Sequence, residues 1–185
     1  MNRLELFERI FPFCEPDRLC LRFSSGTDEI FGWLYKQEQV DSALQAWREN
    51  RLSEISFETK NAKGENYTII SPTRAGVVPH RNGFVSFFVI DLDNHDDGAD
   101  NLVYNMPLQK YFQAEPICFR SKSGKGIHQF YFLSTPISVK DFLKFSKSWG
   151  FNRTGRPEIF PKSEGLSQVW LPNEPNSNGG DSWIV

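Results

Sequence analysis

The sequence has few cysteines and no excess of positive charge. Its 185 residues include three cysteines, Cys14, Cys20 and Cys118, and none of them stands in a C-x-x-C pair or a metal-ligand spacing. A sparse, odd set of thiols argues against a disulfide framework and predicts a cytoplasmic protein with reduced cysteines. The formal net charge of -2 excludes a globally basic surface, so any contact with nucleic acid has to come from local patches.

Long hydrophobic runs are also missing. No apolar stretch approaches the roughly 20 residues that a membrane-spanning helix needs. The first residues, MNRLELFERIF, carry acids inside their apolar pattern, which is unlike a signal peptide. The sequence therefore predicts no membrane partner, and its length predicts one domain with a sizeable core, residues 1–185.

The most informative stretch is FVSFFVIDLDNHDDG, residues 84–98. Its apolar first half predicts a buried strand. Alternation along a strand places Asp91 and Asp93 on one face and Ile90 and Leu92 on the other. Two carboxylates on one face of a buried strand repel each other and lose solvation. A cation between them removes both problems, so this stretch predicts a site for a hard divalent metal.

The first part of the chain, residues 1–80, contains patterns of both helices and strands. Apolar residues at helical spacing predict helices at 4–11 and 40–51, and alternation predicts a strand at 19–23. EISFETK and NYTIISPT flank the turn NAKGE, which is typical of a β-hairpin. The state of residues 27–35 stays open, and residues 73–83 are interpreted as a connector.

The second part predicts a regular order of elements. These are a strand at 84–93, a helix at 99–113, strands at 116–121 and 127–133, a helix at 138–150 and a strand at 156–162. This order is the split βαβ, or ferredoxin-like, arrangement. Right-handed crossovers place the first and third strands side by side in the middle of the sheet, with the fourth beside the first.

Both helices would cover one face of that sheet. Asp91 and Asp93 would then lie on the open face. The third strand carries His128 and the fourth carries Glu158, so both neighbours of the aspartate strand bring a functional side chain towards it.

These residue types predict metal and phosphate chemistry. Asp91, Asp93 and Glu158 are oxygen ligands suited to Mg²⁺ or Mn²⁺. With phosphates supplying further oxygens, such a cluster can hold two metals and support in-line nucleotidyl transfer. Such a reaction also needs groups that bind the triphosphate of a nucleotide.

The turn SKSGKGIH, residues 121–128, supplies such groups. Ser123, Lys125 and the backbone of Gly126 could bind phosphate, and His128 could donate to a phosphate oxygen. The turn is not a Walker loop, because it lacks the required spacing of glycine, lysine and hydroxyl residues. Lys162 is a further phosphate candidate, and Arg74 is a weaker candidate for phosphate or template.

Each feature also has a purely structural interpretation. Asp-x-Asp at a strand end is common, a glycine turn with a lysine is unspecific, and a lone His128 is more often a structural histidine. Glu158 could pair with Arg156 or Lys162. The joint occurrence of these features on adjoining strands favours the functional interpretation.

Three motifs together resemble those of the archaeo-eukaryotic primase superfamily, the primase-polymerases. They are FFVIDLD (87–93), SGKGIH (123–128) and RPEIFPK (156–162), and EIFPK followed by SQVWLP is similar to members associated with plasmids and mobile elements. The resemblance implies an RRM-like catalytic module at 81–172 beside an N-terminal α/β module at 1–80, with 173–185 as a tail or the start of a linker.

The resemblance also implies roles for single residues. Asp91, Asp93 and Glu158 would bind metal, and His128 would contact the incoming nucleotide. Glu158 stands where many members have Asp, and Gly126 stands where some have Ser. No Cys/His cluster for a zinc module is present in the sequence.

The function that follows is template-dependent nucleotidyl transfer by a DNA primase or DNA-directed polymerase. It would use Mg²⁺ or Mn²⁺ at a two-metal site, a dNTP or NTP, and a DNA template with its primer. A helicase or accessory primase domain in a longer parent protein is among the partners that the resemblance allows. The leading alternative is a non-catalytic RRM-like module that binds single strands with Phe87, Phe130 and Phe132 as stacking platforms.

Two further alternatives suit the sequence less well. A rolling-circle nickase needs two histidines around one hydrophobic residue, and His80, His95 and His128 are far apart in sequence. A DxD glycosyltransferase would not need the SGKGIH turn.

Overall fold

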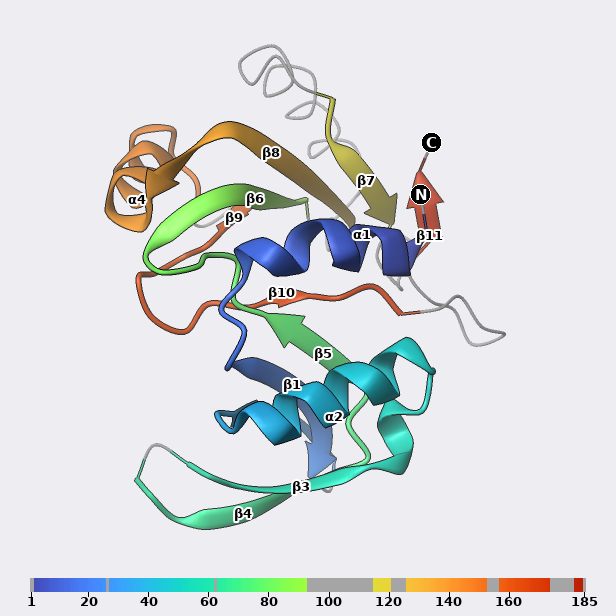
Figure 1. Cartoon of the computed structure of the whole chain (residues 1–185). Coiled ribbons are helices and arrows are strands. Elements are labelled where there is room, and N and C mark those ends of the chain that lie inside the picture. Colours follow the sequence, from blue (N-terminus) through green and yellow to red (C-terminus); the bar gives the residue numbers. More distant parts are fainter. Residues whose placement is uncertain are drawn as a thin grey trace.

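The chain is a mixed α+β protein built on two antiparallel sheets (Figure 1). The structure is a computed structural model and describes residues 2–25, 27–61, 63–92, 115–120, 126–152, 157–173 and 182–184. Its described helices are α1 (Arg3–Ile10), α2 (Gln37–Arg48) and α4 (Val139–Ser148), with 3₁₀ turns η1 (Phe11–Phe13) and η2 (Leu52–Glu54). Within these ranges, no helix is long and apolar enough to cross a membrane.

The N-terminal sheet has four strands in the order β10-β5-β1-β2. The strands are β1 (Leu19–Ser25), β2 (Asp28–Leu34), β5 (Arg74–Val77) and β10 (Val169–Trp170). The predicted strand at 19–23, both predicted helices and the predicted hairpin, β3 (Ser56–Lys60) with β4 (Asn66–Ile70), are confirmed. Helix α2 covers one face of the sheet, across β1 and β5 in Figure 1.

The prediction of a connector at 73–83 is wrong for its first half. Residues 74–77 form β5, which pairs with β1 on one side and β10 on the other. Ala75 and Val77 are fully buried in the core, and the backbone between them is hydrogen-bonded on both edges. Gly76 and the nearby prolines are unfavourable in strands, so the local sequence pattern did not indicate this short strand.

The C-terminal sheet has five strands in the order β11-β7-β8-β6-β9. They are β6 (Phe84–Leu92), β7 (Ile117–Arg120), β8 (Ile127–Ser138), β9 (Glu158–Phe160) and β11 (Ser182–Ile184). The predicted order is confirmed, with the first and third strands central and the fourth beside the first. The predicted helix at 99–113 lies outside the described residues. The tail, predicted as the start of a linker, adds β11 at the edge next to β7.

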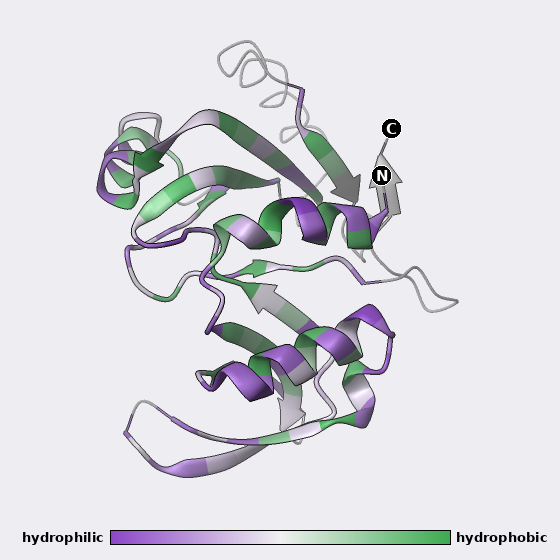
Figure 2. Cartoon of the chain, viewed as in Figure 1, coloured by the Kyte–Doolittle hydropathy of each residue, from purple (hydrophilic) through white to green (hydrophobic). Residues whose placement is uncertain are grey.

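Strand β6 separates two hydrophobic cores. Phe88, Ile90 and Leu92 face α4 and pack with Val139 and Phe142, as the alternation predicts. The other face belongs to a larger core that α1, α2 and the N-terminal sheet share. Figure 2 shows the same pattern, with hydrophobic strands in both sheets and polar outer faces on α1 and α2.

The helix ends follow known capping rules. Asn2 accepts hydrogen bonds from the backbone of Leu4 and Glu5, and Glu5 bonds back to the Asn2 amide, which completes a capping box. Ser138 caps α4, and Gly150 follows it with a φ of 79°. The predicted helix at 138–150 is therefore confirmed as α4, which packs on one face of the C-terminal sheet.

Candidate functional site

Three of the predicted site residues lie in one row across the C-terminal sheet. Asp91 on β6 is directly opposite His128 on β8 and directly opposite Glu158 on β9. Residues directly opposite in antiparallel strands share a face and have Cβ atoms about 5 Å apart. The predicted placement of His128 and Glu158 on the two strands that flank Asp91 is therefore confirmed.

The histidine side of the row is buried. His128 Nε2 lies 3.4 Å from Asp91 Oδ1, and the two side chains are only 9% and 16% exposed. Strand alternation alone brings them together, because both point to the same face from adjacent strands. The histidine thus offers a nitrogen next to a carboxylate in a largely water-free position.

The glutamate side of the row is more open. Lys162 Nζ lies 2.5 Å from Glu158 Oε1, and the side chains are 37% and 44% exposed. Lys162 also sits 4.5 Å above the ring of Phe160. This pairing is one of the structural roles that the sequence left open for Glu158.

The electrostatics of the row explain these partners. Asp91 and Glu158 are like charges on directly opposite positions, an arrangement that destabilises a sheet. His128 and Lys162 place donors or positive charge on the outer sides of the two carboxylates. The row is therefore a pair of acids held between two groups that could also bind phosphate.

The sequence predicts that the face carrying the row is open. This prediction is wrong for most of the length of that face. Phe87 and Phe130, on the same face as Asp91 and His128, are 0% exposed and pack in the core with α1. Phe132 is half-buried beneath the guanidinium of Arg9, at 4.2 Å. Asp91 follows the buried Phe87 and Val89 on this face of β6, so the row lies beyond these apolar residues.

The remaining predicted residues fall in different places. Asp93, Ser123 and Lys125 lie outside the described residues. Gly126 is buried immediately before β8. Arg74 lies on β5 of the other sheet, opposite Arg22, and so does not belong to the row.

The described residues supply two of the three predicted metal ligands. Within the described ranges, which leave out Asp93, no three His, Cys, Asp or Glu side chains form a group that could hold a metal ion. The prediction of a three-acid site for Mg²⁺ or Mn²⁺ therefore stays a prediction.

Sequence reasoning missed a second group of residues with chemical interest. Arg22, Phe31 and Trp170 lie with Arg74 on one face of the N-terminal sheet. The sequence did contain a signal for this group, because Arg22 is a charged residue and Phe31 an aromatic residue within segments of alternating pattern. It became visible only when β5 and β10 were placed in that sheet.

Comparison with known proteins identifies no relative of this chain. A scan against protein-family models and a search of curated proteins both returned no match. The function has to be argued from the residues and their arrangement.

Proposed function

We propose that this protein is a metal-dependent nucleotidyltransferase that starts or extends a primer on a DNA template. The observation that carries the proposal is the row in which Asp91 lies directly between His128 and Glu158. It combines two carboxylates on neighbouring strands with a histidine and a lysine at their outer sides.

The two carboxylates fit a divalent metal. Asp91 and Glu158 are oxygen donors at directly opposite register positions, and Asp93 follows Asp91 by two residues in the sequence. A bound cation would relieve their mutual repulsion. When bound, Mg²⁺ or Mn²⁺ would make the primer 3′-hydroxyl more acidic and neutralise charge on the nucleotide.

The basic groups fit a triphosphate. His128 is held by Asp91, so one ring nitrogen has a fixed partner and the ring keeps one orientation. Lys162 is the residue that we expect to exchange Glu158 for a phosphate oxygen, because both its side chain and that of Glu158 are partly exposed. Ser123, Lys125 and the backbone of Gly126 would complete the phosphate site just before β8.

The strand order supports the same proposal. The order β7-β8-β6-β9, with α4 on one face, is the order expected for the RRM-like catalytic half of the archaeo-eukaryotic primases. The N-terminal sheet with α1 and α2 would be the accompanying α/β module.

The binding-module alternative gains no support from this face. It needs exposed rings at Phe87, Phe130 and Phe132, and the first two are fully buried. A base could stack there only after the core between the sheets had opened.

Extension of a labelled primer on a DNA template, with Mn²⁺ or Mg²⁺, tests the proposal. We expect extension by the wild type, and loss of at least a hundredfold in rate for Asp91→Asn and for Asp93→Asn. Asp17→Asn is the matched control, because Asp17 is an exposed aspartate whose side chain is 57% accessible. Equal extension by the Asp91 and control variants would refute the assignment, as would a wild type that neither extends primers nor binds nucleotide with metal.

A further inference from the structure

The N-terminal sheet has one face that is covered by α2 and an opposite face, here called the outer face. The inner face carries Leu19, Leu21, Ala75 and Val77, which are buried in the core. Alternation turns the residues between them to the outer face. The outer face thus comprises Cys20, Arg22, Glu29, Phe31, Trp33, Arg74, Gly76 and Trp170.

Two aromatic rings meet in the middle of the outer face. Phe31 belongs to β2 and Trp170 to β10, which are the two edge strands of the sheet. Their backbones are three strand spacings apart, about 14 Å, yet the ring centroids are 5.6 Å apart. The rings must therefore reach towards each other over the strands between them.

Small residues allow this arrangement. A Cβ at Gly76 would lie 3.0 Å from Cε3 of Trp170, so any larger residue there would push the indole away from the sheet. Cys20, the register partner of Gly76, is 0% exposed. Phe31 is 55% exposed, which leaves a broad aromatic surface facing solvent.

Two arginines lie beside these rings. Arg22 and Arg74 are directly opposite each other on β1 and β5, a like-charge pairing that destabilises a sheet. Burial, and then the charge of Arg74, lower the pKa of Arg22. Arg22 pairs with Glu29 through one guanidinium nitrogen, but its Nε is buried and has no hydrogen-bond partner among the described residues.

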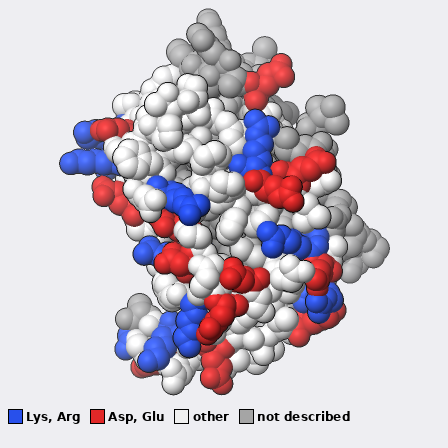
Figure 3. Space-filling view, viewed as in Figure 1, with Lys and Arg blue, Asp and Glu red and all other residues white. Residues whose placement is uncertain are grey.

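We propose that the outer face binds single-stranded nucleic acid, with bases stacked on Phe31 and Trp170 and phosphates paired with Arg22 and Arg74. Exposed rings interleaved with arginines are the combination that binds single strands without sequence preference. On the α2-covered side, Figure 3 shows acidic and basic side chains interspersed among the described residues. This surface lies on a different sheet from the Asp91 row, so the inference does not depend on the nucleotidyltransferase proposal.

Binding of a labelled oligothymidylate of about 12 nucleotides, followed by fluorescence anisotropy, tests the stacking part. The measurement is made in EDTA, where metal-dependent extension cannot occur, so failure of binding and failure of extension are separate results. We expect Phe31→Ala to weaken binding about tenfold. Phe84→Ala is the matched control, because Phe84 is similarly exposed, at 53%, but lies at the start of β6 in the other sheet. We expect this variant to change affinity by less than about twofold.

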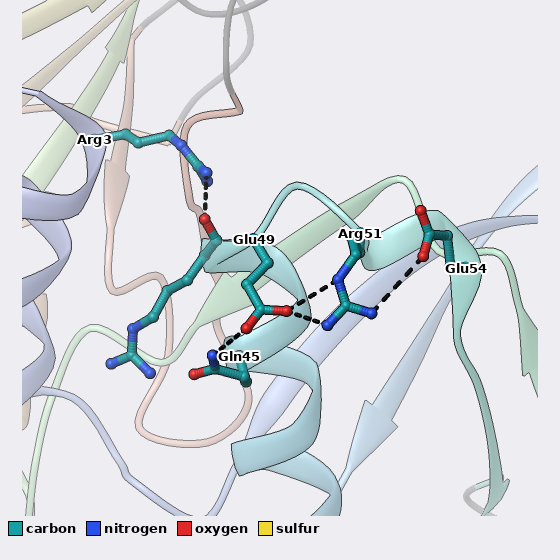
Figure 4. A network of polar contacts seen from close by, with 6 residues as sticks. Arg3, Gln45, Glu49, Arg51 and Glu54 are labelled. Carbon is teal, nitrogen blue, oxygen red and sulfur yellow. Dashed lines mark hydrogen bonds and ion pairs between the residues drawn. The ribbon is translucent and has the colours of Figure 1, made fainter.

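The salt dependence of binding tests the arginines. Each phosphate contact contributes about 0.7 to the slope of log affinity against log salt for single strands. We expect Arg74→Gln and Arg22→Gln each to reduce the slope by about that amount. Arg51→Gln, in the exposed network just after the C-terminal end of α2 (Figure 4), should leave it unchanged.

Three results would overturn the inference. They are undetectable binding by the wild type, equal binding by the Phe31→Ala and Phe84→Ala variants, and an unchanged salt slope in both arginine variants. Self-association through the outer face, seen as a Phe31-dependent dimer in sedimentation and no oligonucleotide binding, would instead identify it as a protein interface. Thermal melts of all variants show that any loss does not come from unfolding.

Discussion

Replacing Asp91 by Asn separates a structural from a functional role of the row. Asn keeps the size of the side chain and removes its charge. If Asp91 serves mainly to hold His128 in a buried ion pair, removing one partner should destabilise the protein by about 3–5 kcal/mol. If the acid is there for a metal, its loss should change the metal-free protein much less.

The geometry gives the size of the smaller effect. Carboxylates on directly opposite residues lie about 6 Å apart, so Asp91 and Glu158 repel by about 3 kcal/mol at an effective dielectric constant of about 20 and by about 0.7 kcal/mol in water. Glu158 is 44% exposed and paired with Lys162, which places the repulsion near the lower value. Relief of that repulsion offsets the lost attraction to His128, so we expect a net change within about 1 kcal/mol.

Thermal denaturation with and without Mn²⁺ measures both effects. A metal at a hundred times its dissociation constant stabilises the folded state by about 2.7 kcal/mol. For a domain of this size that corresponds to a rise in melting temperature of about 5–11 °C. We expect this rise in the wild type and in Asp17→Asn, and its loss in Asp91→Asn.

Two outcomes contradict this reasoning. A metal-induced rise of equal size in Asp91→Asn would show that the ion binds elsewhere. A loss of more than about 3 kcal/mol in the metal-free variant would show that the Asp91–His128 pair is part of the scaffold.

Three further predictions concern the scaffold. Burial raises the pKa of the Cys20 thiol to about 12, so at pH 8 only about one molecule in ten thousand holds a thiolate there, and alkylation followed by mass spectrometry should be about a thousandfold slower than for a free cysteine. Gly76→Ala should destabilise the protein by about 1–3 kcal/mol and change tryptophan fluorescence, because the new methyl group meets Trp170; an unchanged emission spectrum would contradict the close contact. Arg3 is 4% exposed and donates hydrogen bonds to two backbone carbonyls at the end of α2, at 2.9 and 2.8 Å. Arg3→Ala should therefore lower the unfolding free energy, measured by urea titration, by about 2–3 kcal/mol. As the control, Arg51→Ala, at an exposed residue of the same network (Figure 4), should leave the urea midpoint unchanged.

The C-terminal sheet could be predicted because its signals are local and strong. The hydrophobic run before Asp91 is continuous, α4 has a capping serine and a following glycine, and handedness then leaves few ways to order the strands. Strand order predicts that His128 and Glu158 flank Asp91, and the register places the three residues in one row. This is why three residues far apart in sequence could be assigned to neighbouring strands of one sheet.

The N-terminal sheet could not be predicted because its signals are not local. Strand β5 has four residues and includes a glycine, and β10 has two residues. Short strands gain their stability from partners on both sides rather than from their own propensity. The outer face, with Arg22, Phe31 and Trp170, consequently became visible only in the folded chain.

The open face was mispredicted for a different reason. The sequence pattern predicts helices on one side of the sheet and nothing on the other, because it contains no signal for where residues 1–80 dock. In the fold, α1 packs against Phe87 and Phe130 and joins the sheets in one core (Figure 1). That packing limits the candidate site to the end of the sheet.

A break in the regularity of β6 sets the direction in which Asp91 points. Val85 faces α4, and so do Phe88, Ile90 and Leu92, although an unbroken alternation from Val85 would turn the even-numbered residues away from it. At the register shift between Val85 and Phe87, the single residue Ser86 of β6 faces four residues of β8, 133–136, and this bulge changes the alternation of β6. Without this bulge, one end of the strand would have to bury the wrong face, or Asp91 would be turned under α4 among apolar side chains. The bulge opposite Ser86 therefore lets both ends of a long strand bury their hydrophobic residues while Asp91 lies beside His128 and Glu158 at the margin of the core.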